Sequence, residues 1–276
     1  QQSAKAGNIL VNGEVVKSNY KVKPLDVVTV VFSFPPREIE ITPEAIPLEI
    51  VYEDAHLIVI NKQHNLVVHP GHGNYDGTLL NALAHHFAQS GKKEVENNFG
   101  YLVHLIDKDT TGLMIIAKNE LSQTVLAGQF FEHSIDRRYQ ALAWGDLTAD
   151  EGTIEGHIGR SLKDRKVMGV FPDGSHGKDA VTHYKVLRRY GYVSLVECRL
   201  ETGRTHQIRA HFKHIGHPLF NDAWYGGDNI IKGTTFTKYR QFIENCFQLM
   251  PRHALHAKSL GFVHPITGQK MHFDSS

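Results

Sequence analysis

Two runs of apolar residues, 101–106 and 113–117, predict two buried strands joined by a short polar turn. The turn contains two carboxylates, two threonines and a glycine, which are residue types that turns favour. Asp107 stands at the edge of the first run, where a carboxylate against an apolar core is costly unless a cation or hydrogen-bond donors pair with it. Taken alone, this stretch favours a turn-capping role for Asp107 over a chemical one, because Asp is common in turns.

Three further stretches carry apolar residues at the spacing of an amphipathic helix. The first follows Thr78, which is a suitable N-cap, and ends near Gly91. The second begins near Asn119. In the third, Thr205 is the predicted N-cap and Gly216 ends the helix.

The rest of the chain is rich in short strands. Residues 151–200 predict antiparallel structure, because short runs alternate there with glycine-bearing turns. Strands outnumber helices and do not alternate regularly with them, which argues against a doubly wound parallel sheet. The stretch 228–250 is a polar insertion to which the pattern assigns no structure.

A proline-rich stretch divides the chain. Residues 1–33 form a β-rich piece with a hairpin signal at Asn12-Gly13, and they resemble the second half of an S4 RNA-binding module. About thirty residues of β structure can hardly bury a core of their own, so we expect a truncated S4-like piece that binds RNA. Residues 34–49 contain four prolines, which exclude a helix or a central strand and predict a linker. The main domain is expected over residues 50–276.

The 276 residues are 41% hydrophobic and 21% charged, which is an ordinary composition for a soluble protein. A formal net charge of +1 neither requires nor excludes a nucleic-acid partner. Cys198 and Cys246 indicate neither a disulfide framework nor a zinc cage, and they fit a reducing compartment. No apolar run approaches the ~18 residues of a membrane span. We therefore expect a cytoplasmic protein with no membrane partner.

Three groups of residues are candidates for chemistry. One is a set of histidines near the third helix, which could bind zinc although no acidic ligand lies nearby: His206, His211, His214 and His217. Arg204 and Arg209 flank the start of that helix, where an anion could bind, although an ordinary capped helix is an equal alternative. Arg137 and Arg138 precede Tyr139, which suits stacking on an exposed base. A strand-edge tyrosine with solvated arginines is the simpler explanation of that motif alone.

Together these stretches resemble the motifs of the RluA/RluD-type pseudouridine synthases, in the family's order and over about residues 50–273. The matching segments are 52–54, 61–62, 67–71, 104–112, 138–145, 202–209, 217–218, 225–227, 254–257 and 264–265. The resemblance implies an α+β fold, with a catalytic domain built on a long mixed, mainly antiparallel sheet. It implies isomerisation of specific uridines to pseudouridine in structured RNA, by a monomer that needs no cofactor and no metal. The S4-like piece makes large-subunit ribosomal RNA, free or in an assembling particle, the expected partner.

The same resemblance assigns roles to residues of this chain. Asp107 is the expected catalytic carboxylate, Arg209 its ion-pair partner, and Tyr139 the residue that stacks on the flipped uracil. The other expected RNA contacts are His104, Leu105, Lys108, Arg138, Arg204 and His206. The family has an arginine where Leu105 stands, and leucine supplies neither its charge nor its hydrogen bonds, although it can act as an apolar wedge. A catalytically impaired RNA-binding homologue is therefore one alternative, and a histidine-metal hydrolase is another.

Overall fold

The computed structural model describes residues 9–30, 41–71, 73–89 and 101–275. The chain divides into two compact units at the boundary between residues 40 and 41. The larger unit therefore begins before residue 50, where the sequence predicted its start. Ile41, Ile46 and Leu48 pack against the core of that unit, so they are not part of a free linker. Residues 34–40 of the predicted linker lie outside the described residues.

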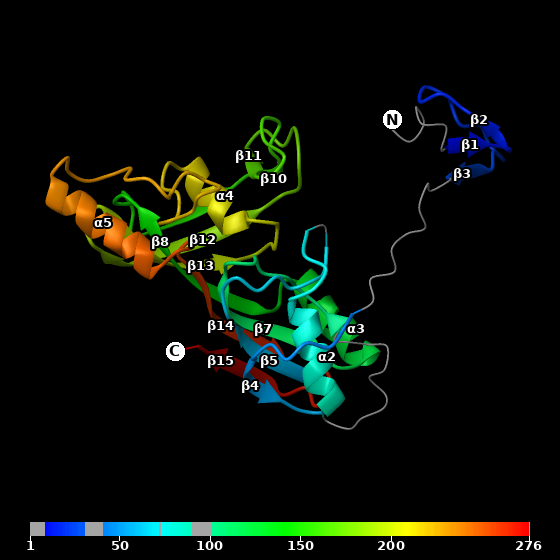
Figure 1. Ribbon diagram of the computed structural model, residues 1–276, viewed down its shortest axis with the longest axis horizontal. Coiled ribbons are helices and arrows are strands. Elements are labelled where there is room, and N and C mark those ends of the chain that lie inside the picture. The colour runs from blue at the N-terminus through cyan, green and yellow to red at the C-terminus, as the bar shows by residue number, and fades with distance from the viewer. Residues whose placement is uncertain (1–8, 31–40, 72, 90–100, 276) are drawn as a thin grey trace. The chain divides into compact units, whose positions relative to one another are not determined.

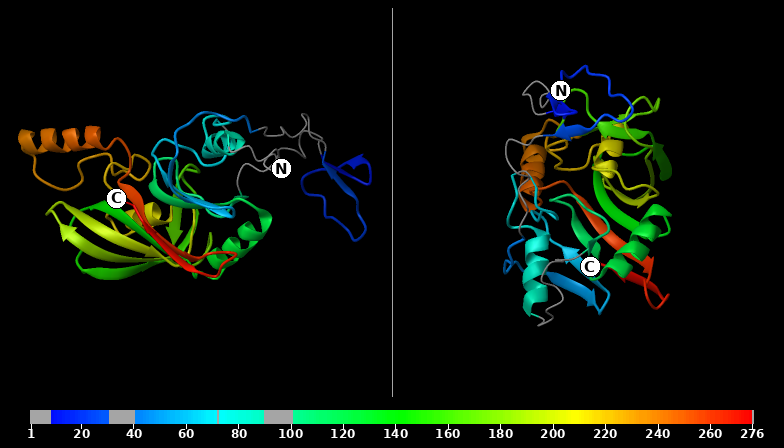
Figure 2. Two further views of the ribbon diagram at one scale, coloured as in Figure 1. Left: turned by 90° about the horizontal axis from the view of Figure 1, so that it is seen from below. Right: turned by 90° about the vertical axis from the view of Figure 1, so that its right-hand side faces the viewer.

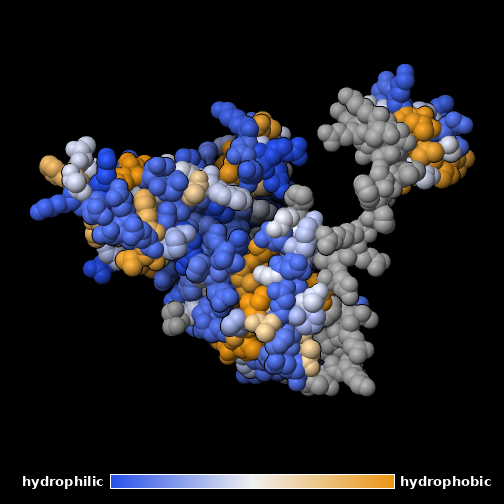
Figure 3. All heavy atoms as spheres, in the orientation of Figure 1, coloured by the Kyte–Doolittle hydropathy of each residue, from blue (hydrophilic) through white to orange (hydrophobic). Residues whose placement is uncertain are grey.

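The smaller unit contains a three-stranded antiparallel sheet in the order β2-β1-β3, made of β1 (Ile9–Val11), β2 (Glu14–Val15) and β3 (Val28–Val30). Asn12 and Gly13 join β1 to β2 with φ angles of 52° and 88°, which confirms the predicted hairpin. Val11 is the only buried residue among those described in this unit, and the orange surface of its strands in Figure 3 is apolar and exposed. The likeness to an S4 module stays a prediction.

The larger unit is built on one mixed sheet in the order β4-β5-β7-β14-β8-β13-β12-β9, with β15 added beside β14 and β6 beside β7 (Figure 1). The pair β7–β14 is parallel and every other pair is antiparallel. This confirms the expected α+β fold. The strands are β4 (Glu49–Glu53), β5 (Leu57–Lys62), β6 (Tyr101–Leu102), β7 (Thr111–Ala117), β8 (Asp136–Trp144), β9 (Glu151–Glu155), β12 (Val181–Arg189), β13 (Val193–Leu200), β14 (Leu255–Val263) and β15 (Lys270–Asp274). A separate two-stranded sheet pairs β10 (His157–Arg160) with β11 (Met168–Phe171).

Two helices cover opposite faces of this sheet (Figure 2). Side chains alternate between the two faces along β5 and β7, so each face has an apolar layer that a helix can cover. One face of these strands packs against Leu79, Leu83 and Phe87 of α2 (Leu79–Gln89). The other face packs against Leu126 of α3 (Glu120–Phe131). The predicted start of the second helix is confirmed, since the Ser122 backbone N–H donates to the Asn119 side chain at 2.9 Å.

The first apolar run forms a shorter strand than the sequence indicated. Only Tyr101 and Leu102 pair with β7, whereas a strand over 101–106 was expected. The Ile115 backbone N–H on the edge of β7 instead donates to the Nε2 atom of His104 at 3.1 Å. Because this side chain takes a donor that a longer β6 would otherwise bind, the chain leaves the sheet before Asp107.

The third predicted helix is α4 (Gln207–His214), and its start differs from the prediction. His206 occupies the N-cap position with a φ of 54°, and Thr205 does not. The Gln207 side chain holds the preceding loop, because its oxygen accepts the backbone N–H of Arg204 at 2.9 Å. A further helix, α5 (Thr237–Leu249), lies in the stretch to which the sequence assigned no structure. Ile243 is its one buried residue, and Tyr239, Cys246 and Phe247 pack beside it against the cluster around Trp144, so an apolar face at helical spacing marks this helix.

The parallel pair β7–β14 requires a glycine at its point of contact. Gly112 has a φ of +110°, and a Cβ added there would lie 2.3 Å from the carbonyl oxygen of Ala257. A side chain would therefore force the two central strands apart. Because the turn that carries Asp107 leads directly into β7, this contact sets how that turn meets β14.

We expect Gly112→Ala to destabilise the larger unit strongly. The left-handed conformation costs alanine roughly 1–2 kcal/mol, and the clash with β14 adds about 1–3 kcal/mol. Denaturant unfolding measures the loss. Gly191→Ala is the matched control, because Gly191 has a φ of +82° and nothing within 4 Å of an added Cβ. Equal losses in the two variants would show that the close approach of the strands contributes nothing.

Candidate active site

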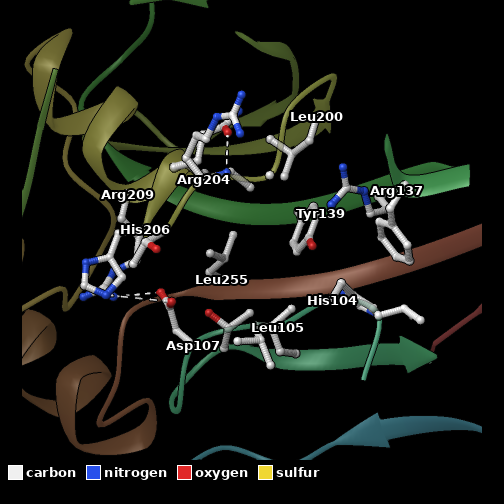
Figure 4. A pocket seen from close by; sticks show the side chains of 18 of the residues that line it. His104, Leu105, Asp107, Arg137, Tyr139, Leu200, Arg204, His206, Arg209 and Leu255 are labelled. Carbon is white, nitrogen blue, oxygen red and sulfur yellow. Dashed lines mark hydrogen bonds and ion pairs between the residues drawn. The ribbon is translucent and has the colours of Figure 1, made fainter. Parts of the chain in front are cut away.

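A cavity of about 720 Å³ opens at the point where β8, the end of β13, the start of α4 and the turn before β7 come together (Figure 4). Its lining includes Asp107, Tyr139 and Arg209, which lie far apart in the sequence. Asp107 is the only carboxylate among the described residues that line it. The fold therefore brings together the three residues expected to be catalytic.

The Asp107 carboxylate is held by a cation. Its Oδ2 atom accepts a hydrogen bond from Arg209 NH1 at 2.8 Å, and its Oδ1 atom lies 3.8 Å from His206 Nε2. The side chain of Asp107 is 23% exposed and that of Arg209 is 5% exposed. The Asp107 oxygens thus face the cavity from a fixed position, and the expected ion pair is present.

The turn that carries Asp107 is fixed from both sides. On one side, the buried Lys62 ammonium donates to the Lys108 carbonyl oxygen at 2.8 Å. On the other side, the Thr110 hydroxyl and the His253 Nε2 atom share a hydrogen bond of 2.8 Å. Burial lowers the pKa of His253 to about 4, so the imidazole is neutral near pH 7. These contacts leave the carboxylate little freedom to turn away from the cavity.

A second carboxylate, Asp222, orients the arginine. Arg209 donates from Nε and NH2 to the two oxygens of Asp222, at 2.7 and 2.8 Å. Burial lowers the pKa of Arg209, but the bonds and charges of Asp222 and Asp107 outweigh burial and raise the pKa above its ordinary value. Asp222 was not among the predicted site residues. It lies in an irregular loop 13 residues after Arg209, where no periodic pattern marks it.

His206 is neutral and points one nitrogen at Asp107. Burial lowers the pKa of this imidazole, so it carries one ring proton near pH 7. Its Nδ1 atom lies 3.0 Å from the Tyr225 hydroxyl, which also accepts the Met168 backbone N–H at 2.9 Å. Burial raises the pKa of Tyr225 to about 12, so its hydroxyl keeps the proton that it donates to Nδ1. The proton on Nε2 then faces the carboxylate, which is the favourable arrangement of charge.

Tyr139 lies on the cavity face of β8 and is 6% exposed. Burial raises the pKa of its hydroxyl, which keeps it protonated at neutral pH. Alternation along the strand places Arg137 on the same face and Arg138 on the other. Arg138 pairs there with Asp136 and Glu197 and does not line the cavity. It therefore cannot contact a nucleotide inside the cavity, and its predicted contact with RNA would have to lie outside. Arg137 lines the cavity instead. It belongs to the basic stretch before Tyr139 but was not among the predicted site residues.

The other predicted RNA contacts differ in position. Leu105 lines the cavity with 63% of its surface exposed. Arg204 also lines it and donates from Nε to the carbonyl oxygen of Asp179 at 2.8 Å. Lys108 is exposed but is not part of the lining. His104 lines the inner wall, where its ring stacks on Phe130 at 4.7 Å between centroids, so its role in the fold is structural.

The four histidines near α4 do not converge. His211 Nδ1 bonds to the Thr182 hydroxyl at 2.9 Å, and His217 Nδ1 bonds to the Trp144 carbonyl oxygen at 2.7 Å. Within the described part of the chain, no group of three or more His, Cys, Asp or Glu side chains is placed to hold a metal ion. The described helices also include none that is both long and apolar enough to cross a membrane.

Comparison with known proteins accounts for this geometry. Residues 56–214 match the model of a family described as RNA pseudouridylate synthase. The chain belongs to this family. A relative from Chlorobaculum parvum, named an uncharacterized RNA pseudouridine synthase, is 45% identical over all of this chain and 84% of its own length. Members named ribosomal large subunit pseudouridine synthase D are 44% identical in Zymomonas mobilis, over 93% of this chain and 77% of theirs, and 43% identical in Escherichia coli O6:H1, over 95% and 77%.

A solved structure has the same family fold. Human RNA pseudouridylate synthase domain containing 1 is 26% identical and superposes with a TM-score of 0.61, over 88% of this chain and 86% of its own. A second human structure, domain containing 4, shows the same fold with a TM-score of 0.65 over 83% of this chain and 88% of its own, at 23% identity.

We expect the stability of the protein to fall as the pH drops from 6.5 towards 4, partly because of His104. Burial lowers the pKa of this imidazole to about 3, so the folded state stays neutral while the unfolded state takes up a proton below pH 6.5. Its contribution is about 1.4 kcal/mol of lost unfolding free energy per pH unit. His104→Gln retains an acceptor for the Ile115 N–H and does not titrate. Urea unfolding at several pH values measures the slope, and equal slopes for the two proteins would contradict a buried neutral histidine.

Proposed function

We propose that this chain isomerises uridine to pseudouridine in structured RNA and that its substrate is large-subunit ribosomal RNA. The observation that carries the proposal is the Asp107 carboxylate, held at 2.8 Å by Arg209 in a cavity whose wall contains Tyr139. The relatives named as large-subunit synthases, at 43–44% identity, support the choice of RNA.

The reaction breaks the N-glycosidic bond of uridine, turns the uracil, and joins C5 of the base to C1′ of the ribose. Product and substrate are isomers, so the chemistry requires no external electron donor or acceptor. Asp107 has three possible targets, which are C1′ of the sugar, C6 of the uracil and the proton on C2′. Each route uses a carboxylate in a site shielded from water, and each is compatible with the position of Asp107.

Tyr139 is proposed to stack on the uracil. A uridine within a helix cannot reach a side chain that is only 6% exposed, so the target nucleotide must leave its stack. Flipping costs a few kcal/mol and is easiest for an unpaired or weakly paired nucleotide. We infer that the substrate presents its uridine in a loop, a bulge or a weak helix.

Arg204 and His206 are proposed to contact the target nucleotide or the phosphate beside it, since both line the cavity. Lys108 and Arg138 lie outside it, so any contact that they make is with RNA around the target. We further propose that the N-terminal piece binds RNA in the manner of an S4 module, and that the enzyme is a cytoplasmic monomer.

The impaired-homologue alternative depends on Leu105, and the high identity to named synthases gives it no support. Leu105 lies exposed at the cavity, where an apolar side chain can fill the space that a flipped base leaves in its stack. The substitution therefore changes how the RNA is opened, and it leaves Asp107 and its ion pair intact.

Asp107→Asn should reduce pseudouridine formation by about a thousandfold or more while RNA binding persists, because the amide keeps the shape of the carboxylate and loses its charge. The assay converts ribosomal RNA in vitro and maps pseudouridine in the product. Asp109→Asn is the matched control, since this carboxylate belongs to the same turn and does not line the cavity. Full turnover by Asp107→Asn would eliminate the proposed mechanism.

Leu105→Ala should lower kcat/KM by about 10-fold or more on RNA whose target uridine is paired, since burial of a leucine is worth roughly 1.5–3 kcal/mol. A smaller loss is expected on an RNA with the same uridine unpaired, where no base stack must be opened. Leu187→Ala is the control, because that leucine is 42% exposed on β12 and outside the cavity. The same loss on both RNAs would contradict a wedge role.

A further inference from the structure

Arg137 is a buried cation that contacts the Phe130 ring but has neither an anion nor a hydrogen-bond acceptor among the described residues. It is 8% exposed, and its Nε atom is buried with no hydrogen-bond acceptor. Among the residues that the structure describes, no carboxylate pairs with it and no oxygen accepts from its guanidinium. Arg209, at the other end of the same cavity, is paired with two carboxylates. An unpaired buried charge destabilises a fold, so an unpaired guanidinium in a cavity wall points to a group that binds there.

The surroundings of Arg137 leave its charge uncompensated. The guanidinium carbon lies 5.1 Å from the centre of the Phe130 ring, which in turn stacks on His104. Burial, and secondarily the charge of Arg137, lower the pKa of His104 to about 3, so this neighbour is neutral. A Cβ at Gly203 would lie 3.1 Å from NH1 of Arg137, so a glycine at that position makes room for the guanidinium. This end of the cavity therefore carries one positive charge and space around it.

The carboxylate, the tyrosine and the unpaired arginine are spaced along the cavity. Asp107 lies at one end, Tyr139 in the middle and Arg137 beyond it (Figure 4). Arg137 and Tyr139 are two positions apart on one face of β8, which separates them by about 7 Å along the strand. A nucleotide with its sugar at Asp107 and its base on Tyr139 directs the far edge of the uracil, with its carbonyl oxygens, towards Arg137.

We propose that Arg137 is a catalytic residue that donates hydrogen bonds to a carbonyl oxygen of the flipped uracil and stabilises the negative charge that forms on the ring. This inference rests on the proposed function. It applies to each route open to Asp107, because each one places charge on the base. A fixed cation aimed at developing charge in a dry site is the kind of group that lowers a barrier most.

The electron movements are balanced in every route. When C1′ is attacked, the C1′–N1 bond breaks and its electron pair stays on N1, delocalised onto the uracil carbonyls. When the C2′ proton is removed, the C–H electron pair forms a C1′–C2′ double bond, and the C1′–N1 bonding pair leaves with N1. When C6 is attacked, a carboxylate oxygen bonds to C6 and the C5–C6 π pair moves onto O4. In the first route C5 then bonds to C1′ and displaces the Asp107 oxygen, and in the second C5 adds to C1′ while a proton returns to C2′. In the third route the C1′–N1 bond breaks after C6 is attacked, C5 bonds to C1′, and the Asp107 oxygen leaves C6. In every route the C5 proton is released and N1 ends with a proton.

A backbone phosphate is the other acceptor to consider for Arg137. The phosphates join the target nucleotide to the rest of the RNA, so they remain near the cavity mouth when the base turns inward. Arg137 lies inside, packed between Phe130 and Gly203. Its position favours a contact with the base. Loss of a contact with the base should lower kcat, whereas loss of a contact with a phosphate should raise KM.

The test compares wild type, Arg137→Met and Arg137→Lys in single-turnover assays. The substrate is a ribosomal RNA fragment whose modified uridine has been mapped with the wild-type protein. Arg137→Met should lower kcat about 100-fold, as loss of one stabilising donor does elsewhere, with KM nearly unchanged. Arg137→Lys retains the charge and should lose less. With 5-fluorouridine at the target, consumption of the nucleoside should depend less on Arg137, because fluorine itself withdraws charge from the ring.

Thermal unfolding without RNA gives an independent readout. Removal of an unpaired buried cation should raise the melting temperature of Arg137→Met, by about 2–4 °C. Arg189→Met is the control, because Arg189 is paired with Asp146 and Asp150 outside the cavity. This variant should keep wild-type kcat and should not gain stability.

Three results would overturn the inference. A lower melting temperature for Arg137→Met would show that the arginine serves the fold. A rise in KM at constant kcat, with a weaker dependence of binding on salt, would show a phosphate contact. If Arg137→Met has the same kcat as the unmodified protein, Arg137 has no catalytic role. Pseudouridine formation by the unmodified protein would still support the proposed function in that case. If the wild type forms no pseudouridine in any ribosomal RNA, the proposed function fails first and the inference fails with it.

Discussion

Arg209 binds two carboxylates with one guanidinium, and the active-site arrangement depends on this interaction. Asp222 takes the Nε and NH2 donors, and the remaining NH1 donor points at Asp107. The planar fork of the guanidinium fixes all three directions at once. Asp222 is 1% exposed and Arg209 is 5% exposed, so removal of either side chain would leave the other as an unpaired buried charge and destabilise the fold. A helix, a loop and the turn before β7 are thereby joined at a single cation.

The cavity exists because the two central strands, β7 and β14, meet over a short distance only. Their paired residues in the register are Thr111 with His256 and Gly112 with Ala257. Further along β7, the His104 imidazole takes the backbone N–H of Ile115, and the chain between β6 and β7 is released to carry Asp107 into the gap. A neutral side chain thus replaces part of a ladder of backbone hydrogen bonds, and the cavity lies in the space that it leaves open.

Much of the fold was predictable from local patterns. The hairpin at Asn12-Gly13, the helix start at Asn119 and the antiparallel strands within 151–200 follow from turn chemistry, capping and alternation, which act over a few residues. The predictions were wrong where a long-range contact overrides the local signal. The strand expected over 101–106 ends after two residues because of the contact between His104 and Ile115. The missed helix α5 is an exception, because Tyr239, Ile243 and Phe247 stand at helical spacing and were a local signal for it.

The sequence by itself determined the motifs, their order and the candidate residues Asp107, Tyr139 and Arg209, because short motifs retain residue types that chemistry needs. Only the tertiary structure decided which of two adjacent arginines faces the substrate. Along β8 the pleat sends Arg137 inward and Arg138 outward, and the strand's register on its neighbours sets which is which. It also decided that Asp222 orients Arg209, since a carboxylate in an irregular loop gains its meaning only from the cation that folding brings to it.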